Sequence, residues 1–156
     1  MQVSHGFIKE PEQLHPGEDV NRTTGSVSYS AKGSGSTNVT ALWGMNKTKD
    51  HDAEHAVLLE GSYVKERMTY YGRYEWVQKS VEELDLDEAK YGHDAIFPVN
   101  ALTGGMAYEM FRWGQTRFSL GGQISLFQAD DRLDELYGAS PVSAQVYLRI
   151  FPGSIR

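Results

Sequence analysis

Apolar and polar side chains alternate along several long stretches of this chain. In residues 142–151 the apolar positions are every second one: Val142, Ala144, Val146, Leu148 and Ile150. Because successive side chains of a β-strand point to opposite faces, this period of two predicts strands with one apolar face. The same pattern predicts seven strands and the end of an eighth. We expect the seven strands at 23–31, 38–46, 56–64, 67–78, 99–112, 117–127 and 142–151, and the eighth at 2–8.

The expected strands are long, and the connections between them alternate in length. Strands of globular proteins usually have five or six residues. Ten residues at ~3.3 Å each, tilted by about 45°, rise roughly 23 Å, which matches the apolar band of an outer membrane. Short turns and long connections then lie at opposite ends of the sheet, as in transmembrane barrels. The short turns are expected at 32–35, 65–66 and 114–115, and the longer connections at 47–55, 80–98 and 128–141.

This pattern predicts an all-β protein. We expect an antiparallel up-and-down meander of about eight long strands that forms a transmembrane β-barrel or part of one. Residues 1–156 would form a single domain, with an irregular connection at 9–20 and long outer loops at 80–98 and 128–141. Both loops are rich in Asp and Glu. Solvated loop surface explains this simply, whereas a functional interpretation is a rim that holds divalent cations or favours cations at a pore mouth.

The two faces of the predicted sheet differ in their chemistry. The apolar face carries aromatic residues suited to the membrane–water interface, and glycines recur on it. The other face mixes hydroxyl, amide and charged groups, as a wet lumen requires. We expect the membrane girdle to consist of Trp43, Tyr63, Tyr70, Tyr74, Trp76 and Tyr108. We expect the lumen lining to consist of Glu60, Tyr71, Arg73, Glu75, Glu109, Arg117, Gln123 and Arg149.

Charge and composition narrow the classes of function. The formal net charge is −6 with a pI near 5.3, which argues against a nucleic-acid partner. There is no cysteine, so disulfides, thiolate catalysis and cysteine-ligated zinc are excluded. The mean hydropathy of −0.49 excludes a bundle of membrane helices but leaves a membrane barrel possible, because the strands of such a barrel alternate.

Over nearly its whole length the chain resembles Gram-negative outer-membrane β-barrels of the porin-like kind. It also looks like the C-terminal part of a larger exported barrel protein. That likeness rests on Ser4-His-Gly6, on Pro11-Glu-Gln-Leu-His-Pro16 and on Arg22-Thr-Thr24, in a stretch that connects two strands. The resemblance implies residence in the cell outer membrane, contact with the lipid bilayer and lipopolysaccharide, and insertion by the outer-membrane assembly machinery. That machinery reads an alternating last strand with a final aromatic, for which Phe151 is present but out of phase.

Candidate chemistry in the sequence is sparse. His51-Asp-Ala-Glu-His55 places two imidazoles and two carboxylates within five residues, which suggests a zinc or copper site, although the segment is expected in a surface loop. No histidine falls within a central strand beside a serine, and there is no phosphate-binding or dinucleotide motif. We therefore expect no catalytic residues, no cofactor and no enzyme. The expected function is a passive pore or a structural membrane barrel.

A soluble, lipocalin-like barrel that binds an apolar small ligand is the alternative. In that protein the apolar side chains would line a calyx, and Arg73 and Glu75 would face water. The calyx residues would be Val39, Leu59, Ile124, Leu126 and Val146. Exposure of Tyr70, Tyr74, Trp76 and Leu120 would favour the membrane protein, and burial of these four would favour the alternative.

Overall fold

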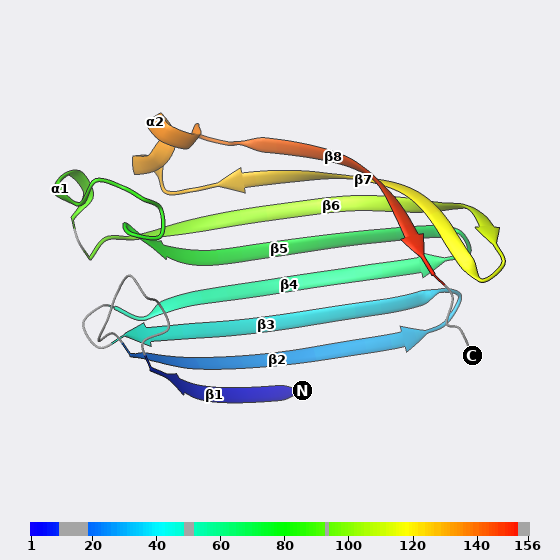
Figure 1. Cartoon of the computed structure of the whole chain (residues 1–156), viewed down its shortest axis with the longest axis horizontal. Helices are drawn as coiled ribbons and strands as arrows, with labels where there is room; N and C mark the ends of the chain where they lie inside the picture. Colours follow the sequence, from blue (N-terminus) through cyan, green and yellow to red (C-terminus); the bar gives the residue numbers. More distant parts are fainter. Residues whose placement is uncertain (10–18, 49–51, 93, 153–156) are drawn as a thin grey trace.

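The computed structural model contains one antiparallel sheet of eight strands, and it describes residues 1–9, 19–48, 52–92 and 94–152. The strands follow one another in chain order across the sheet, so every strand pairs with its sequence neighbours (Figure 1). The expected all-β meander is therefore confirmed. The sheet is curled but is not closed into a barrel, since β1 pairs only with β2 and β8 only with β7.

Most strands are longer than the alternation alone predicts. The strands are β1 (Gln2–Ile8), β2 (Val20–Lys32), β3 (Ser36–Thr48), β4 (Glu54–Lys65), β5 (Met68–Ser80), β6 (Ile96–Trp113), β7 (Thr116–Gln128) and β8 (Val142–Phe151). Three short helices accompany them: α1 (Glu88–Tyr91), the 3-10 helix η1 (Asp131–Leu133) and α2 (Asp134–Tyr137). Among the described residues, none of these helices has the length or the hydropathy needed to cross a membrane.

Short turns and long loops lie at opposite ends of the sheet (Figure 1). Residues 33–35, 66–67 and 114–115 connect strands at one end, called the turn end below. Residues 81–95 and 129–141 connect strands at the other, the loop end. Glu66 and Gly114 adopt positive φ angles of 54° and 59°, which is how these two-residue turns reverse the chain. The expected alternation of connection lengths is thus present, although β6 begins at Ile96 rather than at 99.

One irregularity interrupts the strict alternation. The sequence pattern places Met110 on the apolar face together with Leu102 and Met106, but the pairing of β6 with β7 shifts between Glu109 and Phe111. A bulge inserts one residue and thereby reverses the facing of everything beyond it. Phe111 then pairs with Phe118, and their rings stack with centroids 4.6 Å apart. Met110 has no partner on β7 at the bulge, and beyond it Phe111 and Trp113 lie on the apolar face, while strict alternation would place Arg112 there.

The buried apolar core of the described chain lies under the loops and not under the sheet. Val81, Phe97 and Leu133 are almost completely buried. Phe97 belongs to the start of β6, whereas the other two come from the two long loops. Half-buried side chains surround this cluster: Leu84, Leu86, Tyr91, Ala95 and Ala129. The loops 81–95 and 129–137 are therefore packed together into a small folded unit, which we call the cap.

Candidate pore-lining and lipid-facing surfaces

One face of the sheet, here called the apolar face, is built from the odd-numbered residues of β1–β4 and the even-numbered residues of β5–β8. The pairing register carries this parity across the sheet: Val39 pairs with Gly61, Gly61 with Gly72, and Gly72 with Gly104. All six expected girdle residues lie on it: Trp43, Tyr63, Tyr70, Tyr74, Trp76 and Tyr108. The glycines Gly61, Gly72, Gly104 and Gly122 share this face as well.

Large side chains of the apolar face are exposed. Leu102 is 55% exposed, Ile124 57% and Val146 79%. Of the four residues that separate the two sequence interpretations, Tyr70, Tyr74 and Leu120 are exposed and Trp76 is half-buried. Asp and Glu are absent from the strand positions of this face in the described chain, and Lys47 and Lys65 lie near its opposite ends.

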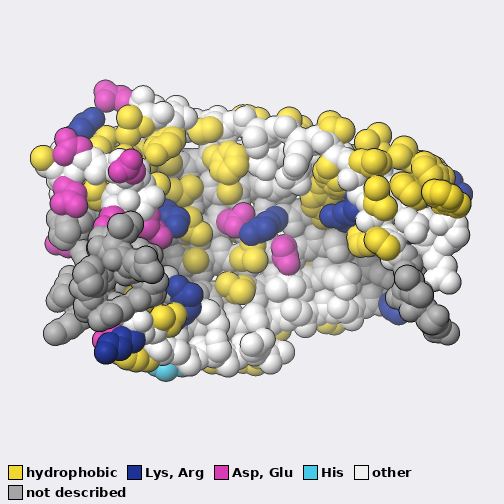
Figure 2. Space-filling view, viewed as in Figure 1, with side chains coloured by type: hydrophobic (Ala, Val, Ile, Leu, Met, Phe, Trp, Pro, Cys, Tyr) yellow, Lys and Arg dark blue, Asp and Glu magenta, His cyan; other side chains and the backbone are white. Residues whose placement is uncertain are grey.

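The opposite face, called the polar face, is the hollowed one. Figure 2 looks into this hollow and shows acidic and basic side chains inside it. All eight residues expected to line a lumen lie on the polar face: Glu60, Tyr71, Arg73, Glu75, Glu109, Arg117, Gln123 and Arg149. On β7 a polar residue is more buried than its apolar neighbours. Ser125 is 6% exposed on the polar face, whereas Ile124 and Leu126 on the apolar face are about half exposed.

Side chains on the polar face bond across neighbouring strands. Hydroxyl and amide groups form these bonds, as between Thr103 and Ser125 at 2.7 Å. The other cross-strand pairs are Ser4 with Thr24, Ser28 with Thr40, Ser30 with Asn38, and Arg22 with Asn46. These bonds connect neighbouring strands on the polar face, which also carries apolar side chains such as Leu42, Leu58 and Val77.

Two tyrosines connect distant strands across the hollow. Tyr71 of β5 and Tyr147 of β8 bring their hydroxyl oxygens to 2.9 Å, and Tyr71 donates to the side-chain oxygen of Gln123 at 3.1 Å. Their rings lie over glycines of the two intervening strands. A Cβ at Gly105 would meet the Tyr71 ring, and a Cβ at Gly121 would meet the Tyr147 ring. The missing side chains at these glycines therefore make the room that the tyrosine pair needs.

Ion pairs occupy the middle and the turn end of the polar face. Arg73 contacts Glu75 at 2.7 Å, and both side chains remain partly exposed inside the hollow. Nearer the turn end, Glu109 forms an ion pair with Arg112 and lies 4.0 Å from Arg117. Exposed pairs of this kind contribute only ~0–1 kcal/mol each. They consequently matter more for the electric field in the hollow than for the stability of the fold.

The cap is held over the loop end by charge contacts as well as by its apolar cluster. The Arg132 guanidinium lies 4.3 Å from the centroid of the Phe97 ring and donates to the Asp130 carboxylate at 2.8 Å. That hydrogen bond holds the pKa of the Asp130 carboxyl below its ordinary value. Lys90 of α1 reaches Glu135 of α2 at 3.6 Å, which links the two loops. The acidic side chains of both loops are therefore carried on a folded support.

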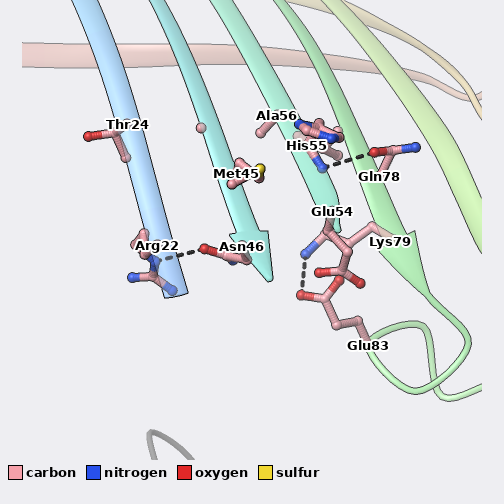
Figure 3. A pocket seen from close by; sticks show the side chains of 12 residues that line it. Arg22, Thr24, Met45, Asn46, Glu54, His55, Ala56, Gln78, Lys79 and Glu83 are labelled. Carbon is pink, nitrogen blue, oxygen red and sulfur yellow. Dashed lines mark hydrogen bonds and ion pairs between the residues drawn. The ribbon is translucent and has the colours of Figure 1, made fainter. Parts of the chain in front are cut away.

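A shallow pocket of about 210 Å³ lies at the loop end between β2 and β5 (Figure 3). Arg22 donates to Asn46 at 2.8 Å on one side, and Lys79 contacts Glu83 at 3.0 Å on the other. Both positive charges of the pocket are thus already engaged within the protein. The pocket widens the hollow next to the cap and adds no separate chemistry.

The expected metal site is not assembled by the described residues. His51 lies outside them, and the described chain contains no group of three metal-ligating side chains. His55 was expected in a loop, but it belongs to β4, and its ring stacks on Trp43 of the apolar face with centroids 5.9 Å apart. The strand begins at Glu54, which pairs with Asn46 of β3, and the side chain of Gln78 accepts a hydrogen bond from the His55 backbone N–H at 2.9 Å.

Comparison of the chain with protein-family models, with curated proteins and with solved structures gives no match in any of the three. The function is therefore inferred from the two faces of the sheet and from the cap. The sequence predicted the membership of each face but not the cap or the tyrosine pair. The cap residues stand in acidic loops without periodicity, and the tyrosine contact spans 76 positions along the chain.

Proposed function

We propose that this chain is a wall of a transmembrane β-barrel in a bacterial outer membrane, acting as a passive pore or a structural barrel. The apolar face would contact acyl chains and the polar face would line the aqueous lumen. The observation that carries the proposal is the exposure of large apolar side chains, such as Leu102, Ile124 and Val146, on the face of the sheet opposite the polar hollow. Soluble proteins rarely expose so large a continuous apolar surface.

The dimensions of the apolar face support the proposal. The row formed by Val39, Gly61, Gly72 and Gly104 lies four residues from Trp76 on one side and four from Tyr108 on the other. Eight residues at ~3.3 Å, tilted by about 40°, separate these two aromatic levels by roughly 20 Å along the membrane normal. That spacing suits aromatic side chains at the two membrane interfaces.

Passive transport suits the polar face better than catalysis does. Several charged groups of the hollow form ion pairs, as in the Arg73–Glu75 and Glu109–Arg112 contacts, and all of them lie on paired strands. Side chains held in this way exert a steady field on passing ions and exclude solutes by size. We propose that Glu60, Tyr71, Arg73, Glu75, Glu109, Arg117, Gln123 and Arg149 line the lumen and select solutes by charge and size.

The proposal is tested with tryptophan fluorescence in lipid vesicles. A variant that retains only Trp43, made by Trp76→Phe and Trp113→Phe, reports on the apolar face; Trp43 is 39% exposed there. A matched variant with all three tryptophans replaced by phenylalanine and with Ser28→Trp reports on the polar face. Brominated acyl chains should quench Trp43 strongly, and aqueous acrylamide should quench the tryptophan at position 28.

The opposite result would refute the proposal. Quenching of Trp43 by acrylamide without quenching by brominated lipid would place the apolar face in water or against protein. Protection of Trp43 from both quenchers, together with saturable binding of an apolar fluorophore in the absence of lipid, would instead support the lipocalin-like barrel. Each variant carries a single tryptophan in an otherwise matched chain, so that a difference in quenching between them reports on the face that carries the tryptophan.

A further inference from the structure

Charged side chains are segregated along the length of the strands. The described parts of the two cap loops carry ten carboxylates against two cations, Lys90 and Arg132. The carboxylates are Glu82, Glu83, Asp85, Asp87, Glu88, Asp94, Asp130, Asp131, Asp134 and Glu135. Figure 2 shows acidic side chains gathered at the end of the molecule that carries these loops. The adjoining strand ends add four cations, Lys9, Arg22, Lys47 and Lys79, and three carboxylates, Asp19, Asp52 and Glu54, so the loop end remains negative.

The turn end has the opposite sign. Six cations lie in its turns and adjoining strand ends, against the two carboxylates Glu66 and Glu109. The cations are Lys32, Lys65, Arg67, Arg112, Arg117 and Arg149. Lys32, Arg112, Arg117 and Arg149 are on the polar face, as the register shows. The hollow thus runs from a negative mouth to a positive one.

The charges at both mouths are held in position. The cap fixes the acidic loops through the buried Val81, Phe97 and Leu133 cluster. At the turn end, the guanidinium groups of Arg117 and Arg149 lie 5.1 Å and 5.4 Å from the centroid of the Phe151 ring. Fixed charges at the two mouths of a channel act on ions in a constant direction, because they do not average out through side-chain motion.

We infer that the lumen is electrically bipolar and that the open channel rectifies ion current; this rests on the function proposed above. The negative mouth concentrates cations and the positive mouth concentrates anions. When the loop-end compartment is positive, cations move inward from the loop end and anions move inward from the turn end. Both accumulate in the lumen, and the conductance rises. The reverse voltage depletes both ions, and the conductance falls.

Salt concentration separates this mechanism from a mere asymmetry of shape. The Debye length is about 10 Å at 0.1 M salt and about 3 Å at 1 M. At 0.1 M the field of each mouth extends into the lumen, whereas at 1 M it is screened close to the charged groups. We expect currents at +100 and −100 mV to differ by more than about twofold in 0.1 M KCl and to become nearly equal in 1 M KCl.

Single-channel recording of the full-length protein in planar bilayers tests the inference. The variant Arg117→Gln with Arg149→Gln should lower the rectification ratio toward one. Lys65→Gln is the control, because it removes one positive charge at the same end but on the apolar face, and it should leave the ratio unchanged, whereas Arg117→Gln alone, which also removes one charge, should lower it. The direction of insertion is read from Glu88→Cys: a positively charged, membrane-impermeant thiol reagent labels the loop end only from the compartment it faces. The chain has no other cysteine.

The outcomes separate the inference from the proposed function. Rectification in the stated direction that disappears at high salt and in the double arginine variant would support the inference. An open channel with equal currents at both voltages in 0.1 M KCl would overturn the inference and leave the pore intact, as would rectification in the reverse direction. Absence of any current from protein shown to be folded in the bilayer would overturn the pore and the inference together.

Discussion

The substitution Val39→Arg tests the orientation of the sheet by its free energy of unfolding. Val39 is 38% exposed on β3, between β2 and β4, so an arginine there meets no packing obstacle from the apolar side. Its row lies midway between the two aromatic levels, about 10 Å from each. A charge at this depth would be close to the bilayer midplane if acyl chains cover the apolar face.

The expected cost follows from that depth. Arginine on the lipid-facing side of a barrel at the midplane destabilises by ~2–4 kcal/mol, which lowers the folding equilibrium constant by more than about 25-fold. A solvent-exposed substitution, in contrast, usually changes stability by less than ~0.5 kcal/mol. The neighbouring Asn38→Arg is the control, since Asn38 is exposed on the polar face and loses only its hydrogen bond to Ser30.

Equilibrium unfolding in urea from lipid vesicles, followed by the fluorescence of the chain and by its gel mobility without heating, measures both variants. We expect Val39→Arg to lose at least ~2 kcal/mol and Asn38→Arg to lose less than ~1.5 kcal/mol. Equal losses, or a larger loss for Asn38→Arg, would contradict the assignment of the apolar face to lipid. The same pair measured in detergent micelles should show a smaller difference, because micelles deform around a charge more readily than a bilayer does.

Two further predictions concern the hollow and the cap. Gly105→Ala should destabilise the fold by ~1–3 kcal/mol, because its Cβ would press on the ring of Tyr71. The adjacent Gly104→Ala is the control, since a Cβ there meets nothing within 4 Å. Chemical denaturation compares the two variants, and equal stability would contradict the tyrosine contact. The lowered pKa of Asp130 means that its contribution to the cap is complete above its ordinary pKa of about 3.8 and is lost as the pH falls through the lowered value. Leu133 methyl resonances should shift below about pH 4 in the parent chain, and an identical transition in Asp130→Asn would refute this assignment.

Alternation was enough to predict the strands and the two faces, because a β-strand repeats every two residues and long strands give many repeats. Where the backbone departs from that repeat, alternation alone no longer gives the facing: beyond the bulge that follows Glu109, Phe111 and Trp113 lie on the apolar face. The expected metal site stays a prediction, because His51 lies outside the described residues. Only the placement of His55 in a loop was wrong, since a strand beginning at Glu54 carries His55 to the apolar face, against Trp43.

Neither the cap nor the tyrosine pair could be predicted from the sequence, for different physical reasons. Phe97 and Leu133 belong to segments whose hydrophobic residues follow no period, so nothing in the pattern says that they meet. Tyr71 and Tyr147 meet only if β5 and β8 stand at matching heights on a curled sheet. That height depends on every intervening pairing register. The only hint in the sequence is Gly105 and Gly121 on the two strands between them, because the missing side chain of each leaves room for one tyrosine ring.

The shortage of buried apolar side chains bears on what covers the sheet. Four hydrophobic residues are fully buried in the described chain, Val81, Phe97, Ala107 and Leu133, and three of them belong to the cap cluster. A water-soluble domain of about 150 residues buries roughly two thirds of its surface on folding, which four such residues do not provide. Covering the exposed apolar face would therefore add stabilisation that the described chain does not obtain from its own core.

The composition of the apolar face favours acyl chains over a protein partner as that cover. Protein interfaces combine an apolar centre with a polar rim and regular hydrogen bonds. The apolar face instead extends from β1 to β8 without a carboxylate at any described strand position, and its two lysines, Lys47 and Lys65, lie near opposite ends, where their long side chains reach a head-group layer. Aromatic side chains occur at several levels of this face, including Trp76 near one end and Tyr108 near the other, and aliphatic side chains such as Leu102 and Ile124 are interspersed among them. A surface of this kind fits a medium that is apolar in the middle and polar on both sides.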